Sequence, residues 1–144
     1  MTKKISLIIP AKNEVESLEA VLSEVMENKL IGEIIVIVDN EQDTSVPIAK
    51  KFNCNLIVQK KNGYGAAIIE GFKNANNEFG CIFNADFSFD PKYLKELAEE
   101  TVKNDFIFGT RYNERSGSDD DTIITFVGNK IFSFITNKIL KIKL

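Results

Sequence analysis

The stretch ISLIIPAKNEVESLEAVLSEVM, residues 5–26, carries a strand pattern followed directly by a helix pattern. Its first part, 5–9, is a short and mostly apolar run that Pro10 stops, as expected for a strand buried on both faces of a parallel sheet. Asn13 with Glu16 three positions later resembles a capping box and predicts the helix start, and Gly32 is expected to mark the end of that unit. The apolar residues between them recur with the helical period of 3.6 residues: Val15, Leu18, Val21, Leu22, Val25 and Met26.

The same alternation of strand and helix continues along the chain. The helices are expected at about 44–52, after the glycine-rich turn in KKNGYGAAIIEGFKNA, and over 91–102, where Pro91 suits a first turn. This order predicts an α/β fold with a mostly parallel sheet and helices on both faces, in one domain over residues 1–144. A polar loop is expected over 112–121. Further strands are expected at 34–38, 56–58, 81–83 and 106–108.

Composition excludes several classes of function. At 144 residues, with 44% hydrophobic and 27% charged residues, the chain is expected to be soluble, globular and cytoplasmic. A net charge of −3 argues against nucleic acid as a partner, since phosphate binding needs a basic face. The chain has no histidine, which excludes a histidine-based triad or zinc site. Cys54 and Cys81 stand alone in apolar segments and are expected to be buried free thiols.

Polar residues follow the expected strands where each strand ends, and ligands of open parallel sheets bind at that edge. Asp39 follows the apolar run IIVIV and suits a ribose hydroxyl or a base N–H, although it equally suits a helix cap. The segment from Lys61 through Gly63 to Gly65 brings backbone N–H groups within reach of a phosphate, or is simply a glycine turn. The segments concerned are 10–14, 39–40, 61–65, 84–86 and 109–111.

Asn84-Ala85-Asp86 is the segment with the clearest chemistry. Residues two apart at a bent strand end can turn toward one ion, and oxygen ligands suit Mg²⁺ or Mn²⁺. Such an ion offsets the charge of a leaving diphosphate. Asp90 is instead expected to cap the helix that begins at Pro91.

Five blocks together carry a family resemblance: SLIIPAKNEVESLEAVL, IIVIVDN, KNGYGAAIIEGF, FNADFSFDPKYLKEL and FIFGTRY. In order and spacing the chain resembles glycosyltransferase family 2, and within it the dolichol-phosphate mannosyltransferase type, over roughly residues 5–140. The resemblance implies a GT-A (Rossmann-like) fold. It also implies an inverting, metal-dependent hexosyltransferase that takes its sugar from a nucleoside-diphosphate sugar, with Mg²⁺ or Mn²⁺ as cofactor.

The resemblance also implies roles for particular residues. Lys12 stands where the family usually has an aromatic residue, Asn84 replaces the first aspartate of the metal motif, and Lys130 is only a loose substitute for an expected second arginine. The chain is also expected to lack the C-terminal part of the family. Pro10, Lys12 and Glu14 would line the nucleoside pocket, Asp39 would meet the base or ribose, Asn84, Ala85, Asp86 and Ser88 would meet diphosphate and metal, and Arg111 would face the phosphates.

The acceptor implied by the resemblance is a polyprenyl phosphate, such as dolichyl or undecaprenyl phosphate. A phosphate monoester is already largely ionised at neutral pH, so this acceptor needs no general base. Two alternatives stay open: a polysaccharide or small hydroxyl acceptor, and a nucleotide-sugar-binding domain without turnover. The segment 122–144 mixes apolar residues with lysines and predicts either peripheral contact with the cytoplasmic face of a membrane or packing against another part of the protein or a second subunit.

Overall fold

The computed structural model describes residues 3–109 and 123–140, which fall into two compact units that divide after Ile107. The second unit contains the helix α5 (Ile123–Leu140). The expectation of one domain over 1–144 stays a prediction. The first unit contains β1 (Ile5–Pro10), α1 (Val15–Met26), β2 (Ile31–Val38), α2 (Val46–Ala49), β3 (Asn55–Val58), α3 (Tyr64–Asn74), β4 (Phe79–Ile82), the 3-10 helix η1 (Pro91–Tyr93) and α4 (Leu94–Glu100).

The four strands form one sheet in the order β3-β2-β1-β4, and every described pairing is parallel. In the middle of the sheet Ile8 pairs with Ile35 of β2 and with Ile82 of β4. Because all strands run the same way, their carboxyl ends meet at one edge, and the loops that follow them lie together there. The predicted α/β sheet is therefore confirmed.

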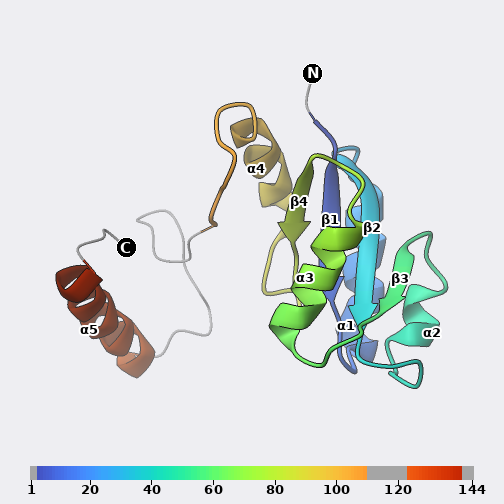
Figure 1. Ribbon diagram of the computed structural model, residues 1–144, viewed down its shortest axis with the longest axis horizontal. Helices are drawn as coiled ribbons and strands as arrows, with labels where there is room; N and C mark the ends of the chain where they lie inside the picture. Colours follow the sequence, from blue (N-terminus) through green and yellow to red (C-terminus); the bar gives the residue numbers. More distant parts are fainter. Residues whose placement is uncertain (1–2, 110–122, 141–144) are drawn as a thin grey trace. The chain divides into compact units, whose positions relative to one another are not determined.

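Helices cover both faces of the sheet, with α3 on one face and α1 and α2 on the other (Figure 1). Successive side chains of a strand point to opposite faces, so Leu7 and Ile9 pack with α1 while Ile8 packs under α3. Gly71 lets α3 lie directly on the sheet, because a Cβ there would sit 2.4 Å from Cγ2 of Ile8. This close approach places the first turn of α3 beside the carboxyl edge of the strands.

Several local predictions were wrong. Asn13 does not cap α1: its φ is +57°, the residue before the helix is Glu14, and neither side chain caps the helix. Gly32 lies inside β2, so it does not end a helical unit.

The expected strand at 106–108 is absent from the described residues, which place Phe106 and Phe108 at 74% and 82% exposure. Apolar composition alone does not make a strand, since a strand requires a neighbour to pair with.

The helix expected over 91–102 is present as η1 followed by α4. Asp90 caps it as predicted, because its Oδ1 accepts the backbone N–H of Lys92 at 2.9 Å. The predicted polar loop at 112–121 lies outside the described residues. The helix α5 covers most of the segment 122–144. Among the helices in the described part of the chain, none is long and apolar enough to span a membrane.

Candidate functional site

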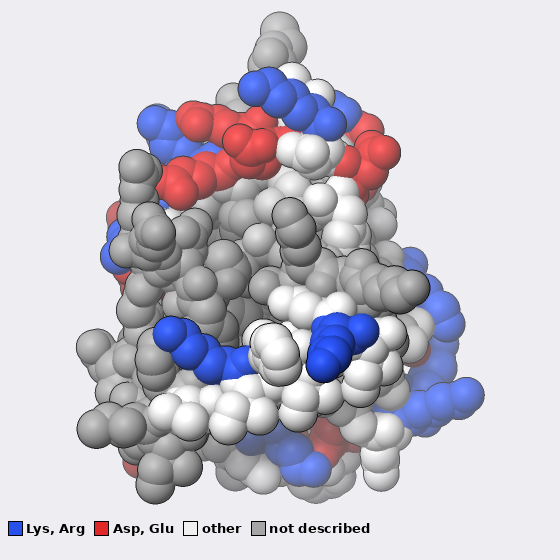
Figure 2. Space-filling view, turned by 90° about the vertical axis from the view of Figure 1, so that its left-hand side faces the viewer, with Lys and Arg blue, Asp and Glu red and all other residues white. Residues whose placement is uncertain are grey.

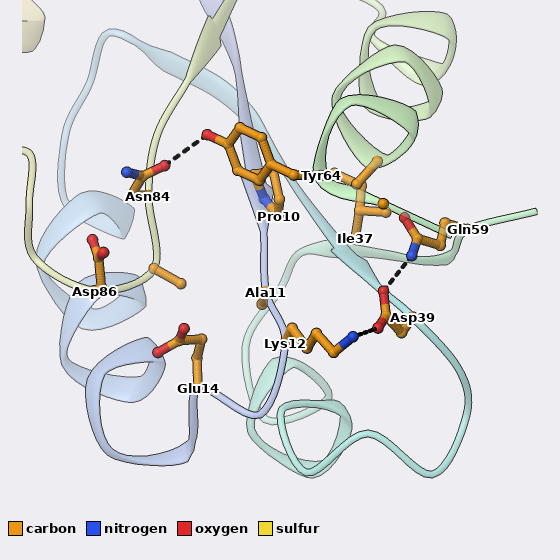
Figure 3. Close-up of a pocket in the computed structure, with 13 residues that line it drawn as sticks. Pro10, Ala11, Lys12, Glu14, Ile37, Asp39, Gln59, Tyr64, Asn84 and Asp86 are labelled. Carbon is orange, nitrogen blue, oxygen red and sulfur yellow. Dashed lines mark hydrogen bonds and ion pairs between the residues drawn. The ribbon is translucent and has the colours of Figure 1, made fainter. Parts of the chain in front are cut away.

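A pocket of about 260 Å³ opens at the carboxyl edge of the sheet, where β1, β2 and β4 end (Figure 3). Strand ends and the loops after them supply most of its wall, and α3 supplies the rest. Its lining residues are Pro10, Ala11, Lys12, Glu14, Ile37, Asp39, Gln59, Gly63, Tyr64, Ala67, Asn84, Ala85 and Asp86.

Asp39, one residue beyond β2, is held on both carboxylate oxygens. Lys12 Nζ lies 2.5 Å from Oδ2, and Gln59 Nε2 donates a hydrogen bond to Oδ1 (Figure 3). The hydrogen bond to Asp39 and the negative charge of that carboxylate raise the pKa of Lys12 above its ordinary value. A nucleoside that binds Asp39 must share these contacts or displace the lysine, whose side chain is 70% exposed.

The turn after β4 holds its polar side chains in fixed positions. Asn84 Nδ2 donates to Ser88 Oγ at 2.8 Å, and the backbone N–H of Ser88 donates to Asp86 Oδ1 at 3.0 Å. Phe87 adopts a φ of +60°, a left-handed conformation that bulky residues rarely adopt. This turn presents both Asn84 and Asp86 to the pocket, which is the geometry expected of the motif.

Tyr64 connects the start of α3 to that turn. Its hydroxyl donates to Asn84 Oδ1 at 3.0 Å across the pocket (Figure 3). Gly63, just before the helix, has a φ of +115°, which an L side chain would adopt only with strain. The predicted glycine turn therefore serves to start α3 and to bring Tyr64 into the pocket wall.

Side chains of the loop after β2 hydrogen-bond to the backbone of the loop between β1 and α1. Asp43 accepts the backbone N–H of Asn13, and Ser45 Oγ accepts the backbone N–H of Glu14 at 2.9 Å. Both side chains are buried. They hold the two residues that precede α1, and they fix the segment that carries Lys12 and Glu14.

The structure brings most of the predicted site residues together at the pocket, and among the described residues two of them lie outside its wall. Ser88 supports Asn84 and Asp86 from behind, Lys61 is exposed and does not line the pocket, and Arg111 lies outside the described residues. The predicted site residues that line the pocket are Pro10, Lys12, Glu14, Asp39, Gly63, Asn84, Ala85 and Asp86.

Sequence reasoning missed Gln59 and Tyr64, along with the apolar lining residues Ala11, Ile37 and Ala67. The signal for Gln59 was present: it is the first polar residue after β3, at the same edge as the other strand ends. Tyr64 lies inside the glycine turn, where the sequence pattern indicates only a role for the backbone. Asp43 and Ser45 carried no signal, because their partners lie about thirty residues away in the sequence.

The residues at the turn after β4 fit a divalent ion only as part of a larger set of ligands. Asp86 offers a carboxylate, and Asn84 offers an amide oxygen that already accepts from Tyr64. The described residues contain no group of three or more Asp, Glu or Cys side chains placed to hold an ion. Such a site suits an ion that receives its remaining oxygens from a phosphate ligand.

Charge on the outside of the molecule is mixed. On the face shown in Figure 2, acidic and basic side chains lie intermingled at the upper end, and the net charge of the chain is −3.

Residues 6–144 match the sequence profile described as Glycosyl transferase family 2. A dolichol-phosphate mannosyltransferase of Pyrococcus furiosus is 34% identical over 119 residues, a match that covers 76% of this chain and 33% of that protein. An uncharacterised glycosyltransferase of Mycobacterium tuberculosis is 30% identical over 109 residues, covering 74% of this chain and 48% of its own. The chain thus spans between a third and a half of the length of these relatives.

Solved structures similar to this one include the glucosyl-3-phosphoglycerate synthase of Mycobacterium tuberculosis. In its complex with Mn²⁺, UDP and glucosyl-3-phosphoglycerate it aligns with a TM-score of 0.62 at 18% identity, over 70% of this chain and 40% of that one. Its complex with Mg²⁺ and UDP aligns equally well, with a TM-score of 0.62 over 70% of this chain and 40% of that one. At this identity the similarity bears on the fold, and it confirms the GT-A type of α/β sheet.

Proposed function

The chain belongs to glycosyl transferase family 2, and from this membership we propose that it binds a nucleoside-diphosphate sugar and transfers the sugar, with inversion, to a polyprenyl phosphate. The observation that carries the proposal is the composition of the pocket. At one end of the pocket is the carboxylate of Asp39, which is held by Lys12 and Gln59. At the other end is the turn that carries Asp86. These are the groups that a nucleoside and a diphosphate require.

The residues of the pocket divide between the two ends of such a donor. Asp39, with Lys12 and Gln59, provides the polar contacts for the nucleoside. Asn84 and Asp86, positioned by Ser88, would hold a Mg²⁺ or Mn²⁺ ion together with the diphosphate oxygens. Such an ion, when bound, would offset negative charge on the leaving diphosphate. Solved relatives of similar fold contain UDP with Mn²⁺ or Mg²⁺, which supports this assignment.

The acceptor is proposed from chemistry and from one relative. A phosphate monoester is already ionised near neutral pH and attacks without a general base, and the chain has no histidine to serve as one. The similarity to a dolichol-phosphate mannosyltransferase supports a polyprenyl phosphate. Arg111, at the position of the family's basic residue, is proposed to face the phosphates.

Lipid acceptors lie in membranes, and α5 offers a means of contact. Val127, Ile131, Phe134 and Ile135 share one face of this helix, with Lys130 and Lys138 in the same segment. Because apolar side chains and lysines lie together on this helix, we propose that it attaches to an anionic surface, with peripheral contact through 122–144 at the cytoplasmic face. Co-sedimentation with anionic but not neutral vesicles is expected, and equal recovery with both would contradict it.

The proposal is tested first by binding. Thermal unfolding is measured with a panel of nucleoside diphosphates, with and without Mg²⁺ or Mn²⁺, because a ligand that binds only the folded state raises the melting temperature. Asp39→Ala should weaken binding of every nucleoside diphosphate by roughly 10- to 100-fold, the value of a lost charged hydrogen bond. Glu41→Ala, which removes an exposed carboxylate from the same loop, is the matched control and should bind normally.

The acceptor is tested by transfer. A labelled sugar nucleotide is offered with a short polyprenyl phosphate or with the same polyprenol lacking phosphate. Label should reach only the phosphate. Transfer to hydroxyl acceptors instead would assign the second kind of acceptor, and binding without any transfer would leave a nucleotide-sugar-binding domain.

A further inference from the structure

Gln59 lines the pocket with one of its amide atoms unsatisfied. The residue is 7% exposed and follows β3 at the carboxyl edge. Its Nε2 donates to Asp39, but its Oε1 finds no hydrogen-bond partner, and among the described residues no other buried side-chain nitrogen or oxygen lacks one. Buried polar atoms are nearly always paired, so an acceptor in a pocket wall without a protein partner is a place where a ligand or a water can donate.

Asp39 fixes which end of the amide faces that ligand. If the Gln59 amide turned by half a revolution, its oxygen would face the Asp39 carboxylate, and two acceptors would repel each other. Lys12 holds the other oxygen of Asp39 and so positions the carboxylate. Figure 3 shows the amide nitrogen directed at Asp39 and the oxygen on the opposite side of the amide group. Gln59 therefore presents an acceptor and not a donor.

The oxygen is enclosed, so a ligand reaches it only after a neighbouring side chain moves. Two polar side chains of the pocket wall are well exposed: Lys12, 70% exposed in its side chain, and Tyr64, 57% exposed. Each has room to turn into solvent. Asp39 and Gln59 would then stand side by side as two hydrogen-bond acceptors.

We propose that Gln59 determines nucleobase specificity, with its Oε1 accepting the ring N–H of a uracil or guanine base. The inference rests on the proposed binding of a nucleoside-diphosphate sugar. Uracil and guanine each carry a ring N–H on the edge that pairs. Adenine and cytosine carry a bare ring nitrogen there, whose lone pair would face the two acceptors. A mismatched base leaves a buried acceptor unpaired, which costs more than a hydrogen bond gains.

The test uses the full chain with saturating Mg²⁺ and measures dissociation constants for UDP, GDP, ADP and CDP by calorimetry. Whichever of UDP and GDP binds more tightly is compared with its analogue methylated at the ring nitrogen, which lacks only that N–H. Both comparisons are repeated in Gln59→Met, which keeps the length of the side chain, and in Gln59→Asn, which withdraws the amide. Gln42→Met makes the same change on an exposed loop and serves as the control.

The wild type should prefer UDP or GDP to ADP and CDP by about tenfold or more, and methylation should cost a similar factor. In Gln59→Met both factors should shrink to about two, while Gln42→Met keeps them. A methylation penalty that survives in the folded Gln59 variants would overturn the inference and assign the N–H to Asp39. A wild-type preference for ADP or CDP would overturn it equally.

Two further outcomes are separable. If Gln59→Met does not fold, the methylated analogue still tests the wild type, and the absence of a penalty there rejects the inference. If no nucleoside diphosphate binds the wild type with metal present, the proposed function itself fails and the inference falls with it.

Discussion

Asp43 accepts the backbone N–H of Asn13 through both carboxylate oxygens, at 3.1 and 3.3 Å, although the two residues lie thirty positions apart. One of the same oxygens accepts the backbone N–H of Ser45 at 2.8 Å. The carboxylate therefore joins the loop after β1 to the loop after β2, and these loops carry Lys12, Glu14 and Asp39. Asp43 does not line the pocket, so we expect it to act by holding these two loops in position.

The first prediction is that Asp43→Ala lowers both stability and nucleotide affinity. Its removal leaves the backbone N–H groups of Asn13 and Ser45 without this partner, and the one on Ser45 is buried, where an unpaired N–H costs about 1–3 kcal/mol. Thermal and urea unfolding measure the stability, and calorimetry with a nucleoside diphosphate measures the affinity. Thr44→Ala is the control, since Thr44 only donates an exposed hydrogen bond to the Asn13 side chain. Unchanged affinity in a destabilised Asp43→Ala protein would reject the positioning role.

The second prediction concerns the metal. Because Asp86 is the one carboxylate of the turn after β4 that lines the pocket, Mn²⁺ should bind weakly to the free protein and well only with a nucleoside diphosphate. Asn84→Asp should tighten binding by adding a charge, and Asp86→Asn should abolish it. Paramagnetic relaxation of water follows the titration.

Tyr64→Phe is the companion variant for the metal site. This variant removes the hydrogen bond from Tyr64 to the Asn84 side-chain oxygen and leaves the charge of the site unchanged. It should therefore change Mn²⁺ affinity less than Asn84→Asp does. Strong binding that needs no nucleotide and survives Asp86→Asn would place the ion elsewhere.

The third prediction concerns pH. Glu33 accepts from Ser6 Oγ at 2.5 Å and from the backbone N–H of Asn76 at 2.6 Å, which ties β1, β2 and the loop before β4 together. Burial raises the pKa of Glu33, but the hydrogen bonds from Ser6, Asn76 and Asn77 lower it by more, so the net shift is downward.

A carboxyl whose pKa is lower in the folded than in the unfolded state contributes stability at higher pH, and that contribution is lost as pH falls through the folded pKa. The free energy of unfolding of the wild type should therefore fall between about pH 5 and pH 3. Glu33→Gln should be less stable at pH 7 and should lose less on acidification. Glu24→Gln removes an exposed charge from α1 and should leave the acid profile unchanged.

The fourth prediction concerns the thiols. Burial raises the pKa of Cys81 to about 11, and it also raises the pKa of Cys54. Since the thiolate is the reactive form, Cys81 in the folded Cys54→Ser variant should react with a disulfide reagent at pH 8 roughly 100-fold more slowly than an unfolded thiol. The rate should rise about tenfold per pH unit. Rapid, pH-independent labelling would show that the strand opens instead.

Most of the fold was predictable because it depends on short-range patterns. The apolar runs of β1 and β2 and the 3.6-residue period of α1 are local, and a parallel sheet follows from their order. Asp39, Asn84 and Asp86 were predictable for the same reason, since residues that end parallel strands must share one edge. The absence of the strand expected at 106–108 could not be predicted, because strand formation depends on a pairing neighbour that composition does not reveal.

The sequence by itself determined that the chain is an α/β protein of glycosyl transferase family 2 with polar groups at the carboxyl edge of its sheet. Only the tertiary structure decided how those groups are held: Lys12 and Gln59 on Asp39, Tyr64 on Asn84, and Asp43 on the loop before α1. Each of these contacts joins two segments far apart in the chain. Residue spacing encodes local periodicity, whereas such contacts exist only once the sheet has aligned its strand ends.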